Sequence, residues 1–456
     1  MASKSKAVRQ QAAKKSNKDG FYLWVVPLLA FVVKVITMAN TPNGGWLGAD
    51  GESYLGGVDG LLAQGYFSDK PILSYWPAGY PILIWLFAKI SVVNAIWILS
   101  FVQSAFYAFA SFYFVKQLRD TKLRPYIFLI GIALAFNPTL SLSSLVVGYE
   151  SSIASCMLMI VGIIIKSRHS LGERKFGIYI VGVGGFSALA SFMQPRWMLT
   201  TLVIACTWAL MHKNRRVQTA ILVGVVGTMA IAPVILVQRN LQSIDQAVIS
   251  TNLGITMQLG AGDNATGGYS NTGGTVPCDP VPPATSVTDS DLVKCVVKWY
   301  AGHPIKAMHL FINKGFFFWS PWSGSLANGT MARNPWLKID PLVNISKGSQ
   351  QGFDLVNKLP GKIISFAWAL GGISMMFMGF FWLRSMKGMY SNLAYVALLP
   401  VVISWLVSMG TIGDHRFRIP TMGLSVFLQV MGYFALRHKV KTRSFAVALE
   451  PSAKAR

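Results

Sequence analysis

The sequence predicts an all-α polytopic membrane protein with about ten transmembrane helices. Hydrophobic residues make up 53% of the 456 positions and charged residues only 13%, whereas a globular domain carries roughly 25% charged residues. The mean hydropathy is +0.46. Apolar runs as long as the ~20 residues that a membrane-spanning helix needs recur along the chain. Strongly basic connectors lie between alternate pairs of these runs, which places both termini on the cytoplasmic side.

Each apolar run predicts one element, taken in chain order. Spanning helices are predicted over 21–38, 93–115, 125–147, 150–166, 176–192, 197–211, 217–237, 362–383, 391–411 and 417–436. The run 80–90 is too short to span, so we expect it to be re-entrant or interfacial. Gly, Thr, Asn, Asp and Pro dominate 260–290, which predicts a loop. Segment 294–318 is predicted to be helical and to end on interfacial aromatic residues.

These elements divide the chain into five regions. They are a basic cytoplasmic tail (1–20), a transmembrane region (21–237) that contains the first external loop (39–92), a long external loop (238–360), the last transmembrane helices (361–437) and a second basic cytoplasmic tail (438–456). Cys278 and Cys295 both fall in the long loop, where a disulfide is predicted if the compartment is oxidising. No internal repeat is visible, so an inverted-repeat transporter gains no support.

The net charge of +24 could serve nucleic-acid binding or membrane orientation, and the positions of the basic residues decide between these two functions. Of the 41 Lys and Arg residues, 25 fall in segments predicted to be cytoplasmic, together with only four acidic residues. That asymmetry is the positive-inside bias, and it also favours attraction to anionic lipid head groups. We therefore expect membrane lipids as partners and no nucleic acid.

A polar stretch, residues 45–81, follows the first apolar run and carries more charge than the runs around it. Apolar residues at helical spacing predict an amphipathic helix over 50–64, lying on the membrane surface and capped by Asp50. Asp50 and Tyr54 are four residues apart and therefore share one face of that helix. A carboxylate at this place has two readings: a helix cap in an external loop, or a base that takes a proton from a hydroxyl.

Charged and aromatic residues gather in four clusters at the predicted external ends of helices. The clusters are Asp50, Glu52 and Tyr54; Lys70–Pro71 with Trp76–Pro77 and Gly79–Tyr80–Pro81; Arg196 with Arg239; and Asp414, His415, Arg416 and Arg418. The positive-inside rule disfavours external arginines, so their presence needs a reason. Snorkelling to lipid head groups is one, and a bound lipid phosphate, which guanidinium groups bind in a bidentate fork, is another. Glu150, at an external helix start, is interpreted as a carboxylate favoured by the helix dipole.

Four short motifs occur in an order and spacing that resemble one enzyme superfamily. They are Asp-x-x-x-Tyr at Asp50 and Tyr54, the run Phe67-Ser-Asp-Lys-Pro-Ile-Leu-Ser-Tyr-Trp76, the run Trp76-Pro-Ala-Gly-Tyr-Pro81, and His415-Arg-Phe-Arg-Ile-Pro420. In these places the chain is similar to the GT-C type glycosyltransferases that use a polyprenyl-phosphate sugar, among them protein O-mannosyltransferases and aminoarabinose transferases. Where that superfamily has a second acidic residue directly after the aspartate, this chain has Gly51, and Glu52 follows one position later.

The resemblance implies an inverting transfer of a hexose or pentose at the external membrane face. The donor would be a polyprenyl-phosphate sugar, and the acceptor a hydroxyl on a glycan, lipid or protein. Asp50 would be the general base with Glu52 as a second catalytic carboxylate. A low-dielectric site would raise the pKa of Asp50 from its usual ~3.9 toward useful basicity.

The other candidate site residues would bind the donor. Lys70 with Arg416 or Arg418 would neutralise the leaving phosphate, with Arg196 and Arg239 as second choices, and Tyr54, Tyr75 and Trp76 would stack on sugar or isoprenoid. No His/Cys metal site is predicted, and a divalent metal requirement stays open. The expected location is a bacterial cytoplasmic membrane. A lipid-linked-sugar flippase or a polysaccharide polymerase remains the alternative; either would gather external arginines but would not need Asp50.

Overall fold

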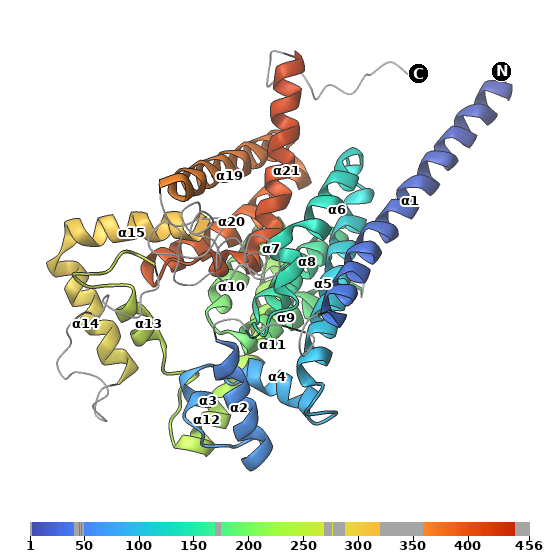
Figure 1. Cartoon of the computed structure of the whole chain (residues 1–456). Helices are drawn as coiled ribbons and strands as arrows, with labels where there is room; N and C mark the ends of the chain where they lie inside the picture. The colour runs from blue at the N-terminus through green and yellow to red at the C-terminus, as the bar shows by residue number, and fades with distance from the viewer. Residues whose placement is uncertain are drawn as a thin grey trace.

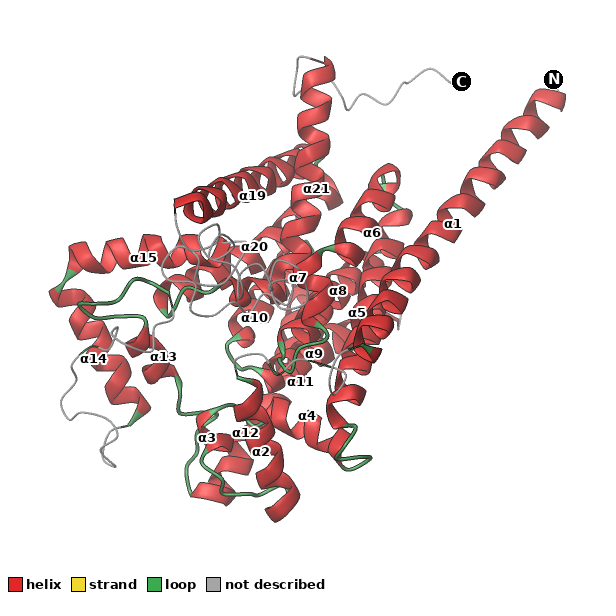
Figure 2. Ribbon diagram, in the orientation of Figure 1, coloured by secondary structure: helices red, strands yellow, loops and turns green. Residues whose placement is uncertain are grey.

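A computed structural model of the chain describes residues 2–40, 45, 47, 50–168, 175–268, 276, 288–319 and 359–442. Within these residues the regular structure is helical, apart from one isolated bridge between Gly268 and Gly413 (Figure 2). The helices are α1 Ala2–Ala39, α2 Gly51–Gln64, α3 Ile72–Tyr75, α4 Gly79–Ala88, α5 Ala95–Arg119, η2 Arg124–Tyr126, α6 Ile127–Phe136, α7 Pro138–Ser143, α8 Glu150–Ser167, α9 Lys175–Met193, α10 Trp197–Leu210, α11 Arg215–Met229, α12 Ile231–Ile244, α13 Leu253–Leu259, α14 Asp289–Gly302, α15 Pro304–Trp319, α19 Leu359–Ser385, α20 Gly388–Gly410, η3 His415–Arg418 and α21 Ile419–Thr442.

The chain is an integral multi-pass membrane protein. Among the described residues, seven helical stretches are long and apolar enough to cross a membrane: Ala95–Arg119, Glu150–Ser167, Lys175–Met193, Arg215–Ile244, Phe366–Ser385, Gly388–Gly410 and His415–His438. Four shorter apolar helices accompany them: Leu23–Ala39, Gly79–Ala88, Arg124–Phe136 and Trp197–Leu210. Three of these short helices correspond to predicted spans and the fourth to the run expected not to span. The predicted count of about ten therefore stays a prediction.

Two predicted spans are interrupted in the structure. The expected helix 125–147 ends at Phe136, because Pro138 cannot continue it, and α7 restarts there with Asn137 as its cap, accepting a hydrogen bond from Leu140 N at 3.0 Å. The expected helix 217–237 is divided at Ala230 into α11 and α12. The chain after α7 turns at Gly148, directly before α8, and this turn delivers two residues to the site described below.

The two ends of the helical body differ in what they contain (Figure 1). The free ends of α1 and α21 both point to the top of the view, whereas α2, α3 and α12 lie together at the bottom. Helix α8 packs against α5, α9 and α21, and it is the most deeply buried of the spanning helices. The helices of the loop that is predicted to be external (39–92) thus lie at the end of the molecule opposite the free ends of α1 and α21.

Helix α2 packs on the helices of its own loop and on the bundle more than an isolated surface helix would. Its contacts are with α3 and α4. Two of its glycines explain the close approach: a Cβ at Gly57 would lie 2.9 Å from Leu73 Cδ2, and one at Gly60 would lie 2.8 Å from Lys70 Cδ. The glycines that weaken a helix in isolation therefore allow this one to dock.

The described part of the long external loop forms helices α13, α14 and α15, beside the end of α20. Of the two cysteines predicted to pair, Cys295 is described by the structure and is disulfide-bonded. Cys278 lies outside the described residues, so the pairing stays a prediction. Cys156 and Cys206 are free thiols.

A buried lysine anchors α15 to the end of α20. Lys314 is 1% exposed, and its ammonium group donates to Tyr300 Oη and to the Thr411 carbonyl oxygen, both at 2.7 Å. Burial lowers the pKa of Lys314 from its usual 10.5 to about 7. The contact fixes Thr411, which is part of the wall of the site.

Candidate active site

A cavity of about 340 Å³ lies where the first external loop, the long external loop and the ends of several spanning helices meet. We refer to it as the site cavity. Its described lining residues are Asp50, Tyr75, Trp76, Tyr149, Gln194, Pro195, Arg196, Ile249, Ser250, Asn252, Leu253, Thr256, Leu259, Asp289, Val407, Thr411, Ile412, Asp414, Arg416 and Phe417. The wall combines carboxylates, guanidinium groups, hydroxyls and aromatic rings, which is the mixture expected of a site for a polar ligand with an apolar part.

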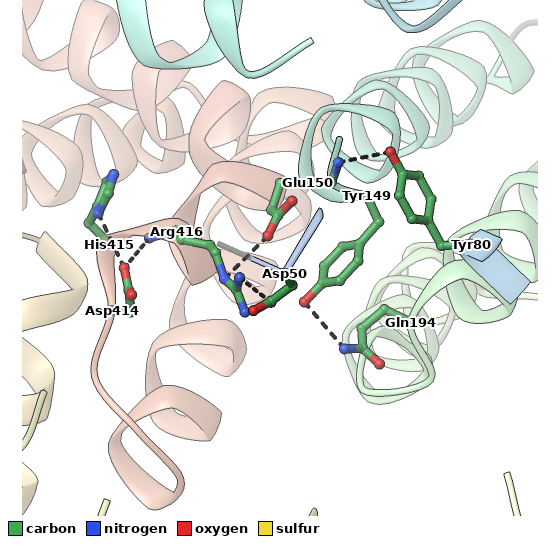
Figure 3. Close-up of polar contacts among 9 residues, drawn as sticks. Asp50, Tyr80, Tyr149, Glu150, Gln194, Asp414, His415 and Arg416 are labelled. Atoms are coloured by element: carbon green, nitrogen blue, oxygen red, sulfur yellow. Dashed lines mark hydrogen bonds and ion pairs between the residues drawn. The ribbon is translucent and has the colours of Figure 1, made fainter. Parts of the chain in front are cut away.

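Arg416 lies between two carboxylates at the centre of the site (Figure 3). Its Nη1 donates to Asp50 Oδ2, and its Nε lies 3.3 Å from Glu150 Oε1. The three side chains are only 10–13% exposed. Asp414 caps the short helix η3 and accepts a hydrogen bond from Arg416 N at 3.0 Å, which fixes the backbone that carries the guanidinium group.

Asp50 takes the predicted capping position but does not cap. It precedes α2, yet its side chain makes no hydrogen bond to the backbone of that helix. The carboxylate is directed to Arg416 instead, 366 positions away along the chain. The contact with the guanidinium group holds the Asp50 carboxylate in place. The expected rise in the pKa of Asp50 stays a prediction.

Glu150 is a site residue that the sequence interpretation missed. It does begin α8, as the helix-dipole interpretation requires, but its carboxylate also pairs with Arg416. Gly148 makes room for it, because a Cβ there would lie 2.4 Å from Glu150 Oε2. A signal was present in the sequence, because Glu150 is the one acidic residue in the stretch 125–167. It directly follows Tyr149, which lines the site cavity in the structure.

A group of tyrosines packs behind the ion pairs. Tyr149 lines the site cavity and its hydroxyl accepts a hydrogen bond from Gln194 Nε2 at 3.2 Å. The ring of Tyr54 meets those of Tyr80 and Tyr149 edge to face, with centroids 5.1 and 6.3 Å apart. Tyr80 in turn accepts a hydrogen bond from Gly148 N at 2.8 Å and so supports the turn before Glu150. Burial raises the pKa of Tyr54 and of Tyr149, so both phenols keep their protons.

Arg196 is the second guanidinium group of the cavity wall. Its centre lies 3.9 Å from the centroid of the Phe417 ring, a cation–π contact that holds the side chain in place. Its Nη2 is buried and has no hydrogen-bond partner among the described residues. Burial lowers the pKa of Arg196, but an arginine remains charged. A buried cation with an unused donor favours an anionic ligand.

The structure brings five of the ten predicted site residues to this cavity: Asp50, Tyr75, Trp76, Arg196 and Arg416. Two predicted residues of α2 lie elsewhere. Glu52 is exposed and is not among the described lining residues. Tyr54 is 3% exposed and belongs to the tyrosine group behind the wall, where its ring packs against those of Trp76 and Tyr80.

Three cations that were predicted to bind phosphate are also absent from the described wall: Lys70, Arg239 and Arg418. Lys70 packs its alkyl chain on Gly60 of α2. Arg418 is buried and donates to the Trp319 carbonyl oxygen at 3.0 Å. Of Lys70, Arg416 and Arg418, only Arg416 is among the described lining residues of the site cavity, and the predicted convergence of these cations on one anion stays a prediction.

Arg239 organises the first external loop. It is 1% exposed, and its guanidinium group donates to the carbonyl oxygens of Tyr66 and Leu73 at 3.3 and 3.4 Å and also to that of Ser68. These bonds hold α12 against the segment that leads into Tyr75 and Trp76. Arg239 is a positioning residue for the loop, which explains why a guanidinium group is required there.

Among the described residues, no group of three or more His, Cys, Asp and Glu side chains is placed to hold a metal ion. In the candidate site, the guanidinium group of Arg416 lies between the carboxylates of Asp50 and Glu150.

The comparisons with known proteins returned one solved structure. No protein-family model and no curated protein matches the chain. The chain is similar to the archaeal oligosaccharyltransferase AglB from Archaeoglobus fulgidus, whose structure was solved in complex with an inhibitory peptide and a dolichol-phosphate. The two are 12% identical, with a TM-score of 0.44 over 96% of this chain, and the chain spans about half (52%) of the length of AglB. At this sequence identity and TM-score, the similarity to AglB does not show the activity of this chain.

Proposed function

We propose that the chain is a membrane glycosyltransferase that moves a hexose or pentose from a polyprenyl-phosphate donor to an acceptor hydroxyl in the site cavity. One observation carries the proposal: the carboxylate of Asp50 and the half-buried guanidinium group of Arg196, whose Nη2 has no partner among the described residues, line the same cavity. The first can remove a proton and the second can bind an anion, and the transfer needs both.

The chemistry is a single displacement. The acceptor oxygen attacks the anomeric carbon while its proton passes to the carboxylate of Asp50. The bond between the anomeric carbon and the phosphate oxygen breaks, and the electron pair leaves with the polyprenyl phosphate. Attack from the side opposite the leaving group inverts the anomeric centre.

Two cations have different tasks in this reaction. Arg416 contacts Asp50 and Glu150, so its charge serves to hold the base in place. Arg196 remains to bind the donor phosphate, which is also the leaving group, and a hydrogen bond to a charged group contributes ~1.5–3 kcal/mol. Tyr75 and Trp76 line the same wall and provide aromatic surfaces for the sugar or the first isoprenoid units. This replaces the sequence-based choice of Lys70 as the phosphate ligand.

The acceptor would be a glycan, lipid or protein hydroxyl in the same cavity. The cavity lining includes Ser250, Asn252 and Thr256 from the long external loop, side chains that bond hydroxyl groups, and we assign the acceptor to them. We place the protein in a bacterial cytoplasmic membrane, with the site cavity on the external face.

The test is an assay for bond cleavage. Purified protein in nanodiscs is incubated with polyprenyl phosphates that carry a radiolabelled hexose or pentose, with host membrane extract as the source of acceptor. Released polyprenyl phosphate together with label in a new product supports the proposal. In proteoliposomes, transport of the intact labelled donor across the bilayer without its cleavage would instead identify the lipid-linked-sugar flippase. Label joined into chains that remain on the lipid would identify the polysaccharide polymerase.

A further inference from the structure

A second cavity lies at the far ends of three helices that line the site cavity. It encloses about 280 Å³, and we refer to it as the basic-end cavity. The site cavity lies beside the first residues of α8 and α10 and the last residues of α20. The basic-end cavity is lined at the other end of each helix, by Ile164, Ile165, Ser167, Arg168, Trp208, Met211, His212, Gly388, Met389, Asn392, Leu393 and Val396.

The two cavities lie a membrane thickness apart. Helix α8 has 18 residues, which at 1.5 Å per residue makes it about 27 Å long. The hydrocarbon core of a bilayer is ~30 Å thick. The basic-end cavity is therefore at the membrane face opposite the site cavity.

Polar groups lie at the membrane-surface end of the basic-end cavity. Arg168 follows the last turn of α8, where its guanidinium group donates to the Asp120 carbonyl oxygen at 3.1 Å and contacts the sulfur of Met389. His212 follows α10, and its Nε2 is buried without a hydrogen-bond partner among the described residues. Asn392 adds an amide on the first turns of α20. A phosphate group could accept bonds from all three side chains.

Apolar side chains extend from these polar groups toward the centre of the bilayer. On α20 the apolar lining residues Leu393 and Val396 lie beyond Gly388, and Val396 is about 12 Å along the helix from it and one turn deeper than Asn392. Trp208 on α10 and Ile164 on α8 precede the polar residues of their helices by about one turn. The cavity is thus polar at the membrane surface and apolar below it, which is the polarity of one lipid molecule.

The charge around this cavity favours an anion. The connectors 116–124, 166–168, 213–216 and 384–387 together contain eleven Lys and Arg residues, and Asp120 is the one acidic residue in them. Two hydrogen bonds place the first connector beside the cavity: Lys122 N donates to Tyr390 Oη at 2.8 Å, and Arg168 reaches the Asp120 carbonyl oxygen. Such a cluster attracts anionic lipid head groups.

We propose that the basic-end cavity binds one anionic phospholipid of the adjacent leaflet, with its phosphate against Arg168 and His212 and an acyl chain along Trp208 and Val396. A free phosphate compound would leave the apolar wall in contact with water, so the shape and polarity of the cavity favour the lipid. The inference is independent of the glycosyltransferase proposal, because none of its residues lines the site cavity.

The experiment measures lipid retention. The protein is reconstituted in vesicles of phosphatidylglycerol and phosphatidylcholine, extracted in mild detergent and weighed by native mass spectrometry. We expect one retained phosphatidylglycerol in the wild type and a several-fold lower occupancy in Arg168→Gln. The matched control is Arg215→Gln, which removes an exposed guanidinium group at the same membrane face that does not line the cavity. An equal loss in both variants would show general surface attraction and overturn the proposal.

A second variant tests the cavity without a change of charge. Because Arg168 also binds a backbone carbonyl, Arg168→Gln could loosen the 118–122 turn. Asn392→Phe fills the cavity and leaves that contact intact, so it should also lose the retained lipid. Retention of the lipid by Asn392→Phe would overturn the proposal. Glycerol phosphate added in excess distinguishes the sources of the anion: it should not displace the phospholipid, and displacement would replace the lipid with a soluble phosphate compound as the ligand.

Discussion

The two ends of α8, α10 and α20 carry charge in opposite ways. At the site end, Asp50 and Glu150 surround Arg416, so acid and base are matched within contact distance. At the other end, eleven basic residues face one acidic residue. Unmatched charge at a membrane surface follows from insertion and lipid attraction alone. Acidic and basic groups that are paired and largely buried cost desolvation free energy and fix the geometry of their side chains, which indicates a site where positions matter.

The comparison of the two ends depends on the orientation of the chain in the membrane, which places the site end on the external face. In a Cys206→Ser background, a membrane-impermeant thiol reagent applied to intact cells should modify Asp263→Cys, an exposed position at the site end. It should not modify Lys213→Cys, an exposed position at the basic end. Labelling at 213 alone would place the site cavity in the cytoplasm and remove the external transfer.

Replacement of the proposed base tests the chemistry of the site end. Asp50→Asn keeps the shape and an acceptor for Arg416 but cannot take a proton, so turnover should fall by ~10²–10⁴-fold. Donor affinity should change little, because Arg196 binds the phosphate. The measurements are release of polyprenyl phosphate and donor binding in nanodiscs.

Glu52→Gln is the matched control for that substitution. Its carboxylate is exposed on the first turn of the same helix and outside the described cavity wall, so turnover should stay near that of the wild type. Loss of turnover in Glu52→Gln with an active Asp50→Asn would move the base to Glu52. Wild-type turnover in both variants would leave the transferase without its chemistry and favour a flippase.

The proposed phosphate ligand should affect binding more than the chemical step. Arg196→Gln removes a charged donor and keeps a polar side chain of moderate size. A hydrogen bond to a charged group contributes ~1.5–3 kcal/mol, so the KM for the donor should rise roughly 10–100-fold.

Lys70→Gln serves as the comparison for Arg196→Gln, because the sequence favoured Lys70 as the phosphate ligand and the structure does not bring it to the described wall. Its donor KM should equal that of the wild type. A rise for Lys70→Gln and none for Arg196→Gln would restore the sequence-based choice.

The sequence predicted what depends on local pattern. The helix positions, the non-spanning run 80–90 and the start of a loop helix at Asp50 follow from apolar periodicity and capping residues, and the structure has helices in all of these places. The break at Pro138 was also readable in principle, since proline ends a helix. The membrane crossings of the three short helices and the orientation stay predictions.

The partners of charged side chains could not be predicted in the same way. Asp50 and Arg416 are 366 positions apart, and no spacing rule connects them. Arg196 and Arg239 look alike in the sequence, each at an external helix end, yet one keeps an unused donor in the cavity and the other binds loop carbonyls. Tertiary packing decides which cation is structural, and that information is not local.

Lys314 provides a test of how the site end is held together. Its pKa is about 7 in the folded protein against an ordinary 10.5, so the unfolded chain binds more protons between these values. Stability should therefore rise with pH, by about 2 kcal/mol from pH 7 to pH 9 for this group. Lys314→Met should remove that rise, whereas Lys298→Met, at an exposed lysine of α14, should keep it. The measurement is the thermal unfolding midpoint in detergent at both pH values. If Lys314→Met retains the wild-type rise, the lysine is not the group that titrates, and its bonds to Tyr300 and Thr411 hold α15 in place independently of pH.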